Sequence, residues 1–374
     1  MKPLLCWLLL AALPLRAADV SSNRSLPVRG FCIAAPSTNR LDEFIKFIEE
    51  ELAPRSANTL VLRVDYNFQF KSRPEMSDPA SLSREAAQRI ASVCQKHQIQ
   101  VIPLIDLLGH QSWQSHVGKL LKIHPEFDET PEVKFPDKYA WPNPDRLYCK
   151  SYCPRHPEVH DFLFPMIDEV CDAFGADAFH AGMDEVFYIG EDQCPRCKGH
   201  KPAELFADEI RTLRDHLELK KRRLWIWGDR LLDGNITGLG EWEASNNDTS
   251  GAVDLIPKDV LICDWHYDRP DQTAVYFAMK GLDVVSCPWR KPDVAEAQVQ
   301  DMLRFRASST PQMRKHFLGV MQTIWSGSNG FLDEFYGRRP ARVRDNPDHT
   351  ESKCFIRLFE ALKKSQETSH SGSP

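Results

Sequence analysis

Residues 157–185 read PEVHDFLFPMIDEVCDAFGADAFHAGMDE, and this stretch decides the fold. Over residues 157–174, apolar side chains recur at intervals of three and four, which predicts an amphipathic helix. The run at 178–182 is short and apolar, which predicts a buried strand. Two acids, Asp184 and Glu185, follow it almost directly. The stretch is therefore one helix and one strand, and it ends in a pair of carboxylates.

The same alternation of helix and strand runs through the rest of the chain. Strands are predicted at 28–34, 59–64, 101–105, 178–182, 223–227, 260–263, 284–287 and 317–323. Helices are predicted at 41–52, 83–97, 157–174, 203–219, 273–279, 294–309 and 355–363. Only the connection between the fifth and sixth strands lacks a clear helical pattern. Eight such units predict an α/β fold, a (β/α)8 TIM barrel, rather than a doubly wound sheet with nearer six strands.

The first residues have the pattern of an export signal. Lys2 precedes an apolar run over residues 4–15, and Leu15-Arg16-Ala17 is a suitable cleavage site, so a signal peptide is predicted at 1–17. No later stretch has the roughly 20 apolar residues that a membrane span needs. We therefore expect a periplasmic or secreted protein without a span in its mature chain. The remainder is predicted to be a single catalytic domain at 18–364 and a disordered polar tail at 365–374.

The composition indicates which classes of binding partner to expect. The chain has 47 Lys and Arg against 53 Asp and Glu, a net charge of −6, with 42% hydrophobic residues. That is ordinary globular composition, and it lacks the basic excess of a nucleic-acid-binding surface. We therefore expect no nucleic-acid partner, and nothing in the composition fixes the oligomeric state.

Active residues of such barrels lie where strands end and loops begin. These positions hold Asp106, His110, His180, Asp184, Glu185, Trp227, Asp229, Asp264, Trp265, Tyr267, Trp289 and Trp325. Tryptophan at four successive strand ends predicts a pocket with flat apolar walls and an acidic floor, which suits a sugar ring. Each tryptophan could instead be core, and each histidine could be a buried partner of an acid.

Two segments resemble a known enzyme family. His180-Ala-Gly-Met-Asp-Glu185 resembles the His-x-Gly-Gly-Asp-Glu signature of family 20 glycoside hydrolases, the β-N-acetylhexosaminidases, with Met183 in place of the second glycine. The segment from Ile102 to His110, IPLIDLLGH, is similar to that family's Ile-Pro-Glu-Ile-Asp-x-x-Gly-His. Arg29-Gly30 resembles its sugar-binding arginine. The resemblance covers residues 28–363 and is nearer to the single-domain hexosaminidase D type than to the multidomain types.

The resemblance implies an exo-acting, retaining hydrolase that releases terminal β-linked N-acetylglucosamine, N-acetylgalactosamine or both. The 2-acetamido oxygen of the substrate would be the nucleophile, Glu185 the acid and base, and Asp184 the acceptor for the acetamido N–H. On an extended segment these two neighbours would project in different directions. No cofactor and no catalytic metal are implied.

The resemblance also implies a set of substrate-binding and orienting residues. They are Arg29, Asp106, His110, His180, Trp227, Asp229, Trp265, Tyr267 and Trp325. Tyr267 would hold the acetamido oxygen, and Asp106 and His110 would orient His180 and the acid. Many members carry a glutamate two residues after the last tryptophan, whereas Trp325 is followed here by Ser326-Gly327. The preference between gluco and galacto sugars is therefore open, and Asp229 or Asp264 could supply the missing acceptor.

Two other functions remain compatible with the sequence. A barrel of this type could bind amino sugars without hydrolysing them, which the substitution at Met183 and the missing glutamate would fit. Alternatively, an unrelated barrel glycosidase could use Asp106, Asp229 or Asp264 as its own nucleophile.

The cysteines and one long loop complete the predictions. Two close pairs, Cys149-x3-Cys153 and Cys194-Pro-Arg-Cys197, are compatible with disulfides, with a structural zinc site or with free thiols. The connection at 107–157 is long for a turn and is interpreted as a lid or subsite wall. Three sequons, at Asn23, Asn235 and Asn247, leave glycosylation open.

Overall fold

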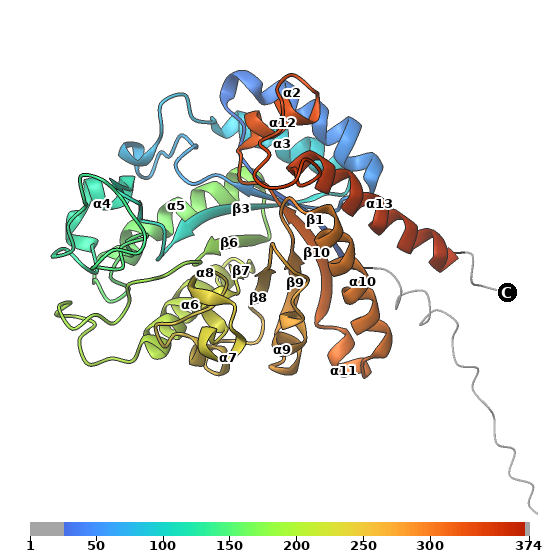
Figure 1. The fold of residues 1–374 in the computed structure, drawn as a ribbon. Coiled ribbons are helices and arrows are strands. Elements are labelled where there is room, and N and C mark those ends of the chain that lie inside the picture. Colours follow the sequence, from blue (N-terminus) through green and yellow to red (C-terminus); the bar gives the residue numbers. More distant parts are fainter. Residues whose placement is uncertain (1–25, 371–374) are drawn as a thin grey trace, which may run out of the picture.

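The structure, a computed structural model, describes residues 26–370, so the predicted signal peptide at 1–17 lies outside the described residues. Eight parallel strands close into a barrel in the order β1-β10-β9-β8-β7-β6-β3-β2 (Figure 1). Their bounds are β1 Val28–Ala34, β2 Thr59–Arg63, β3 Gln100–Leu107, β6 Ala178–Gly182, β7 Arg223–Trp227, β8 Leu261–Trp265, β9 Asp283–Cys287 and β10 Phe317–Thr323. The predicted (β/α)8 barrel is confirmed.

Helices surround the barrel, as Figure 1 shows. The longer ones are α2 Leu41–Phe47, α3 Arg84–Lys96, α5 Val159–Phe174, α6 Pro202–Glu218, α9 Thr273–Met279, α10 Pro292–Ser308, α12 Ser328–Phe335 and α13 Glu351–His370. Short helices are α4 Lys119–Ile123, α7 Gly234–Thr237, α8 Gly240–Glu243 and α11 Pro311–Arg314, and a hairpin joins β4 Ser112–Trp113 to β5 His116–Val117. The connection from β7 to β8 holds only short helices, as its sequence predicts.

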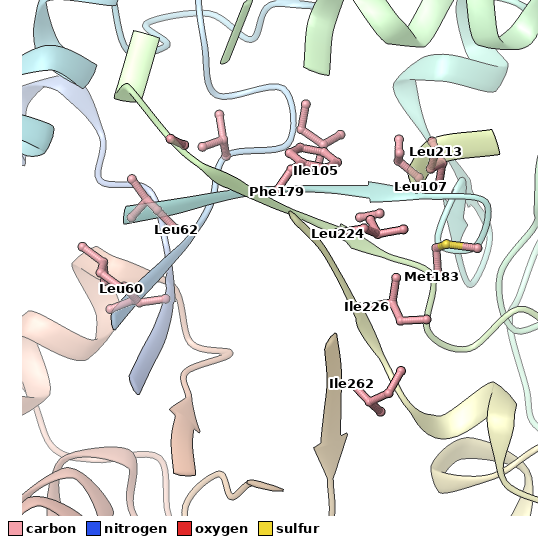
Figure 2. Close-up of a cluster of buried hydrophobic side chains, with 14 of the residues drawn as sticks. Leu60, Leu62, Ile105, Leu107, Phe179, Met183, Leu213, Leu224, Ile226 and Ile262 are labelled. Atoms are coloured by element: carbon pink, nitrogen blue, oxygen red, sulfur yellow. The ribbon is translucent and has the colours of Figure 1, made fainter. Parts of the chain in front are cut away.

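Residues along each strand alternate between two hydrophobic cores. Side chains on the outer faces of the strands, such as Leu60, Phe179 and Ile226, pack with helix residues such as Leu213 of α6 (Figure 2). Side chains on the inner faces fill the barrel with Val61, Leu104, Trp225 and other buried residues. Since every strand is covered on both faces, the strand sequences are almost continuously apolar.

Local signals in the sequence explain where the helices begin and end. The Ser83 hydroxyl accepts the N–H of Ala86 and caps the first turn of α3. Helix α5 ends at Phe174, and the next residue, Gly175, has a φ of 60°, which suits glycine and turns the chain toward β6. The predicted boundary at Ser365 lies inside α13, because this helix continues to His370. A helix that is already packed extends readily through polar residues, since each further residue adds a backbone hydrogen bond.

Within residues 26–370, no helix has the length and apolar character that crossing a membrane requires.

Candidate active site

A cavity of about 700 Å³ opens at the end of the barrel where the strands finish. Its lining residues are Trp113, Tyr148, Asp184, Glu185, Trp242, Glu243, Trp265, Tyr267, Asp268, Trp289, Arg290, Trp325, Ser326, Glu334, Arg342, Arg344, His349, Thr350 and Glu351. Five of the predicted site residues are among them: Asp184, Glu185, Trp265, Tyr267 and Trp325. The cavity thus combines acids with flat aromatic surfaces, as the strand ends predict.

Asp184 and Glu185 follow β6, and both contact one histidine. His110 Nε2 lies 3.3 Å from Asp184 Oδ2 and 3.1 Å from Glu185 Oε2. The expectation of an extended segment with diverging side chains is wrong, because Met183 and Glu185 have φ values of 68° and 47°. This turn brings both carboxylates to the same imidazole. Such unfavourable backbone persists only where surrounding contacts impose it, and it gathers at functional sites.

The electrostatics of this group favour an ion pair. Burial by itself lowers the pKa of His110, but the charge of Asp184 and hydrogen bonds to both acids raise it well above its ordinary value. Burial by itself raises the pKa of Asp184, but the charge and hydrogen bond of His110 hold it below its ordinary value. Asp184 is therefore a carboxylate paired with an imidazolium, and it can accept a hydrogen bond from a ligand.

Asp106, near the end of β3, lies against Gly182 in the neighbouring strand β6, two residues before Asp184. Burial, together with the charges of Asp184 and Asp65, raises the pKa of Asp106 well above its ordinary value, which favours the neutral carboxyl. The expected hydrogen bond from Asp106 to His180 is absent from the described residues. Instead, His180 Nδ1 accepts the N–H of Gly182 at 3.0 Å, and His180 Nε2 has no hydrogen-bond partner there.

Asp229 positions Glu185 and is itself outside the cavity lining. Its Oδ2 accepts the backbone N–H of Glu185 at 2.9 Å and Arg230 Nε at 2.7 Å, and its Oδ1 accepts Trp265 Nε1 at 3.2 Å. Arg230 also donates to the carbonyls of Glu241 and Trp242. With three donors on a buried carboxylate, Asp229 acts through Glu185 and Trp265, and the expected direct contact with substrate is not supported by its position.

Aromatic side chains from three strand ends form one wall. Tyr267 lies between Trp265 and Trp289, with ring centroids 4.9 and 5.4 Å away. The Tyr267 hydroxyl accepts Trp325 Nε1 at 2.9 Å, which ties the ends of β8 and β10 together. Trp227 is 1% exposed and packs under this wall against His180 and Trp325. For Trp227 the alternative of core packing is therefore the correct one.

The opposite wall comes from the long connection between β3 and α5. Trp113 stacks on His110 with ring centroids 6.0 Å apart, and Tyr148 packs edge-on against Trp113 at 5.1 Å. Tyr148 also contacts Trp242 from the β7–β8 connection at 5.8 Å. The loop therefore serves as a wall of the cavity. Tyr148 and Trp242 are not at strand ends, so the sequence pattern does not identify them.

Two residues with a suggested role in sugar binding, Arg29 and Asp264, lie away from the cavity. Arg29 is the second residue of β1, at the end of the strand remote from the cavity, and donates to the carbonyls of Ser56 and Leu26. The prediction that Arg29 binds sugar is wrong, because its strand continues for five residues before reaching the mouth. Asp264 faces away from the barrel interior and bonds Thr273 Oγ1 at 2.7 Å. Strand alternation puts it opposite Trp265.

Arg63, unlike Arg29, lies at the mouth of the barrel. It ends β2, and its guanidinium lies 4.4 Å from the ring centroid of Trp325 and donates to the carbonyl of Ile324 at 3.3 Å. The sequence analysis did not identify Arg63. Its position at the end of an apolar strand could have indicated it, because that end of each strand meets the cavity.

Glu351, the first residue of α13, organises the wall near β10. Its Oε1 accepts Trp289 Nε1 at 2.6 Å and the N–H groups of Trp325 and Ser326 at 2.8 and 3.2 Å. Its Oε2 accepts the hydroxyl of Ser326. A carboxylate therefore stands beside Ser326, although the sequence lacks the glutamate expected in that segment.

We expect Glu351→Ala to lower the free energy of unfolding by about 1–3 kcal/mol, since four donors lose a buried acceptor. Near-ultraviolet circular dichroism should change with it, because Trp289 and Trp325 lose their common anchor. Glu351→Gln is the matched control. Its amide oxygen can replace Oε1, so a loss equal to that of alanine would contradict the anchoring role.

A second buried network is formed by His266, Glu243 and Asp264, next to the aromatic wall. His266 Nδ1 lies 2.8 Å from Glu243 Oε2, and His266 Nε2 lies 3.1 Å from Asp264 Oδ1. Burial by itself lowers the pKa of His266, but these two acids raise it to about 10. A raised pKa in the folded state stabilises the protein below the ordinary histidine value near 6.5, and this stabilisation is lost as the pH rises through 10.

We expect His266→Asn to cost about 3 kcal/mol at pH 6, because two buried acids lose their cation. The difference from the wild type should shrink steadily as the pH approaches 10. Chemical denaturation at several pH values measures it, and the exposed His116, replaced in the same way, is the control. A loss of stability that does not vary with pH would contradict the proposed dependence of stability on the protonation of His266.

Comparisons with known proteins identify the family of this chain. The profile of "Glycosyl hydrolase family 20, catalytic domain" matches residues 65–329. A β-hexosaminidase from Akkermansia muciniphila is 27% identical over 132 residues, which are 35% of this chain and 25% of that protein. The chain thus spans a quarter of that relative's length.

Solved structures share the fold. A chitobiase from Flavobacterium johnsoniae superposes with a TM-score of 0.62 at 17% identity, over 92% of this chain and 51% of that chain. A β-N-acetylhexosaminidase from Bacteroides fragilis has a TM-score of 0.59 at 17% identity, over 93% of this chain and 67% of that chain. Because the family profile covers more than half of its residues, this chain belongs to glycosyl hydrolase family 20.

Proposed function

We propose that this protein is a glycoside hydrolase that releases terminal β-linked N-acetylhexosamine. The observation that carries the proposal is the pair Asp184 and Glu185, which share His110 at the floor of an aromatic-walled cavity. Membership of the family and the β-hexosaminidase and chitobiase names of its relatives support the same substrate class.

In the proposed mechanism, the substrate supplies its own nucleophile. The 2-acetamido oxygen attacks the anomeric carbon, while Glu185 donates a proton to the leaving oxygen. Asp184, held as a carboxylate by His110, accepts the acetamido N–H and stabilises the positive charge that develops there. Water then opens the intermediate with Glu185 as base, so the β configuration is retained.

In this proposal, Tyr267 completes the arrangement around the acetamido group. A phenol that accepts the Trp325 indole N–H still carries a hydrogen that it can donate. Directed at the acetamido oxygen, this donor would align it for attack, while Trp265 and Trp325 enclose the sugar ring.

The positions of the other acids speak against an enzyme nucleophile. Asp264 faces away from the barrel interior, and Asp229 is occupied by three donors. Asp106 lies against Gly182, in surroundings that favour its neutral form. None of these three lines the cavity.

The test is hydrolysis of three 4-nitrophenyl β-glycosides, those of N-acetylglucosamine, N-acetylgalactosamine and glucose. Turnover confined to the two acetamido sugars, with the β-anomer formed first by NMR, supports the proposal. Their rate ratio measures the gluco or galacto preference that Ser326-Gly327 leaves open. Turnover of the plain glucoside would instead identify an enzyme nucleophile, and tight binding without turnover would identify a sugar-binding protein.

A further inference from the structure

Three cysteines and one glutamate meet between two loops at the barrel mouth. Glu129 and Cys153 belong to the connection from β3 to α5, and Cys194 and Cys197 to the connection from β6 to α6. Cys153 Sγ lies 3.6 Å from Cys194 Sγ and 3.5 Å from Cys197 Sγ. One carboxylate oxygen of Glu129 and the three sulfur atoms all lie within 4.8 Å of one another, and all four residues are buried.

The loop that carries two of the cysteines has the form of a metal-binding turn. At Cys194-Pro-Arg-Cys197, the N–H of Cys194 donates to the carbonyl of Glu191 at 3.0 Å, and the N–H of Lys198 donates to the carbonyl of Cys194 at 2.9 Å. A Cys-x2-Cys turn is typical of zinc sites.

Glu129 supplies an independent indication of a cation. Its Oε1 accepts the N–H groups of Gly190 and Glu191 at 3.1 and 3.3 Å. Its Oε2 is buried, and within residues 26–370 it has no hydrogen-bond partner. A buried carboxylate oxygen without a partner is costly, and a metal ion shared with thiolates removes that cost.

We propose that Glu129, Cys153, Cys194 and Cys197 bind one zinc ion that has a structural role. Tetrahedral zinc with bonds to sulfur of about 2.3 Å holds the sulfur atoms about 3.8 Å apart, close to the separations observed. A disulfide of about 2.05 Å would use two of the three cysteines and leave the third beside Glu129. Four protein ligands leave no open position, so this ion has no place for substrate.

The site corrects the pairing suggested by the sequence. Cys149 is not a member of the cluster, because its thiol donates to the carbonyl of Glu185 at 3.1 Å. Glu129 takes the fourth position instead, and no local pattern marks it. The ion links the loop that carries Trp113 and Tyr148 to the loop that follows Glu185, so it fastens the cavity wall to the acid pair.

Metal content and thiol content of the whole protein test the proposal together. Protein purified without chelators and dialysed against metal-free buffer should contain about one zinc per chain by mass spectrometry of the elements. After unfolding in guanidinium with a chelator, ten of the 11 cysteines, all except Cys6 of the predicted signal peptide, should react as free thiols. Metal-free protein, or protein with only eight reactive thiols and hence one disulfide, would overturn the proposal.

Single variants locate the ion. Cys197→Ser should lose zinc at concentrations of chelator that leave the wild type loaded, whereas Cys149→Ser, the matched control from the same loop region, should retain it. Equal retention in both variants would place the metal elsewhere and contradict the assignment. If Cys197→Ser does not fold, X-ray absorption on the wild type decides. Three sulfur neighbours at about 2.3 Å and one oxygen at about 2.0 Å are expected, and any other shell rejects the site.

Discussion

Glu185→Gln is expected to reduce kcat by about 10²–10⁴-fold on N-acetylhexosaminides whose leaving group is a sugar or a simple alcohol. Such leaving groups must be protonated as the bond breaks, and an amide cannot supply the proton. The loss should be smaller for 4-nitrophenyl glycosides, because 4-nitrophenolate leaves without protonation. The comparison of kcat between the two kinds of substrate is therefore the diagnostic measurement.

The controls separate chemistry from folding. Glu204→Gln makes the same change on the exposed start of α6 and should leave both rates unchanged. Asp184→Asn removes the acceptor for the acetamido N–H and should slow both kinds of substrate alike, since it acts on the nucleophile rather than on the leaving group. If Glu185→Gln also slowed both substrates equally, or slowed neither, Glu185 would not be the general acid.

Gly182→Ala is expected to lower the free energy of unfolding by about 2–4 kcal/mol and to abolish most activity. Gly182 has a φ of 67°, which an L side chain adopts only with strain, and an added Cβ would lie 1.9 Å from Asp106 Oδ1. Because Gly182 lies two residues before Asp184 and the charges of Asp106 and Asp184 interact, this conflict would disturb Asp184. Thermal and chemical denaturation measure the loss of stability.

Gly175→Ala separates the two causes. Gly175 has a similar φ of 60°, but a Cβ there would meet nothing within 4 Å. This variant should therefore show only the backbone cost, roughly 1–2 kcal/mol. The excess loss in Gly182→Ala measures the conflict with Asp106. If the two glycines gave equal losses and Gly182→Ala stayed active, the close approach of Asp106 would have no consequence.

The strands could be predicted almost residue by residue, for a physical reason. In a closed parallel barrel, every strand is buried on both faces, so each is a short apolar run that stands out between amphipathic helices. Runs such as 28–34 and 178–182 agree with β1 and β6 at both ends. Helix ends were predicted less accurately. Helix α13 runs from Glu351 to His370, whereas the prediction was 355–363, because a packed helix extends into polar sequence without a local signal.

The acid pair was predictable for a related reason. Asp184 and Glu185 follow an apolar strand directly, and strand ends of a barrel converge on one mouth. The convergence of both carboxylates on His110 was not predictable, since it depends on positive φ values at Met183 and Glu185. The family resemblance also misassigned Arg29, whose place at the beginning of β1 puts it at the end of the barrel remote from the cavity.

The (β/α)8 fold and the acids at its mouth could therefore be predicted from the sequence, because apolar runs and helical periodicity are local properties of the chain. Tertiary packing, by contrast, brings together groups that are distant in the sequence: Glu351 beside Trp289 and Trp325, Asp229 against the backbone of Glu185, and Glu129 among three cysteines. Each of these carboxylates lies on a loop or helix end far along the chain from its partners. Their meeting depends on how the loops pack over the barrel, and no local pattern carries that information.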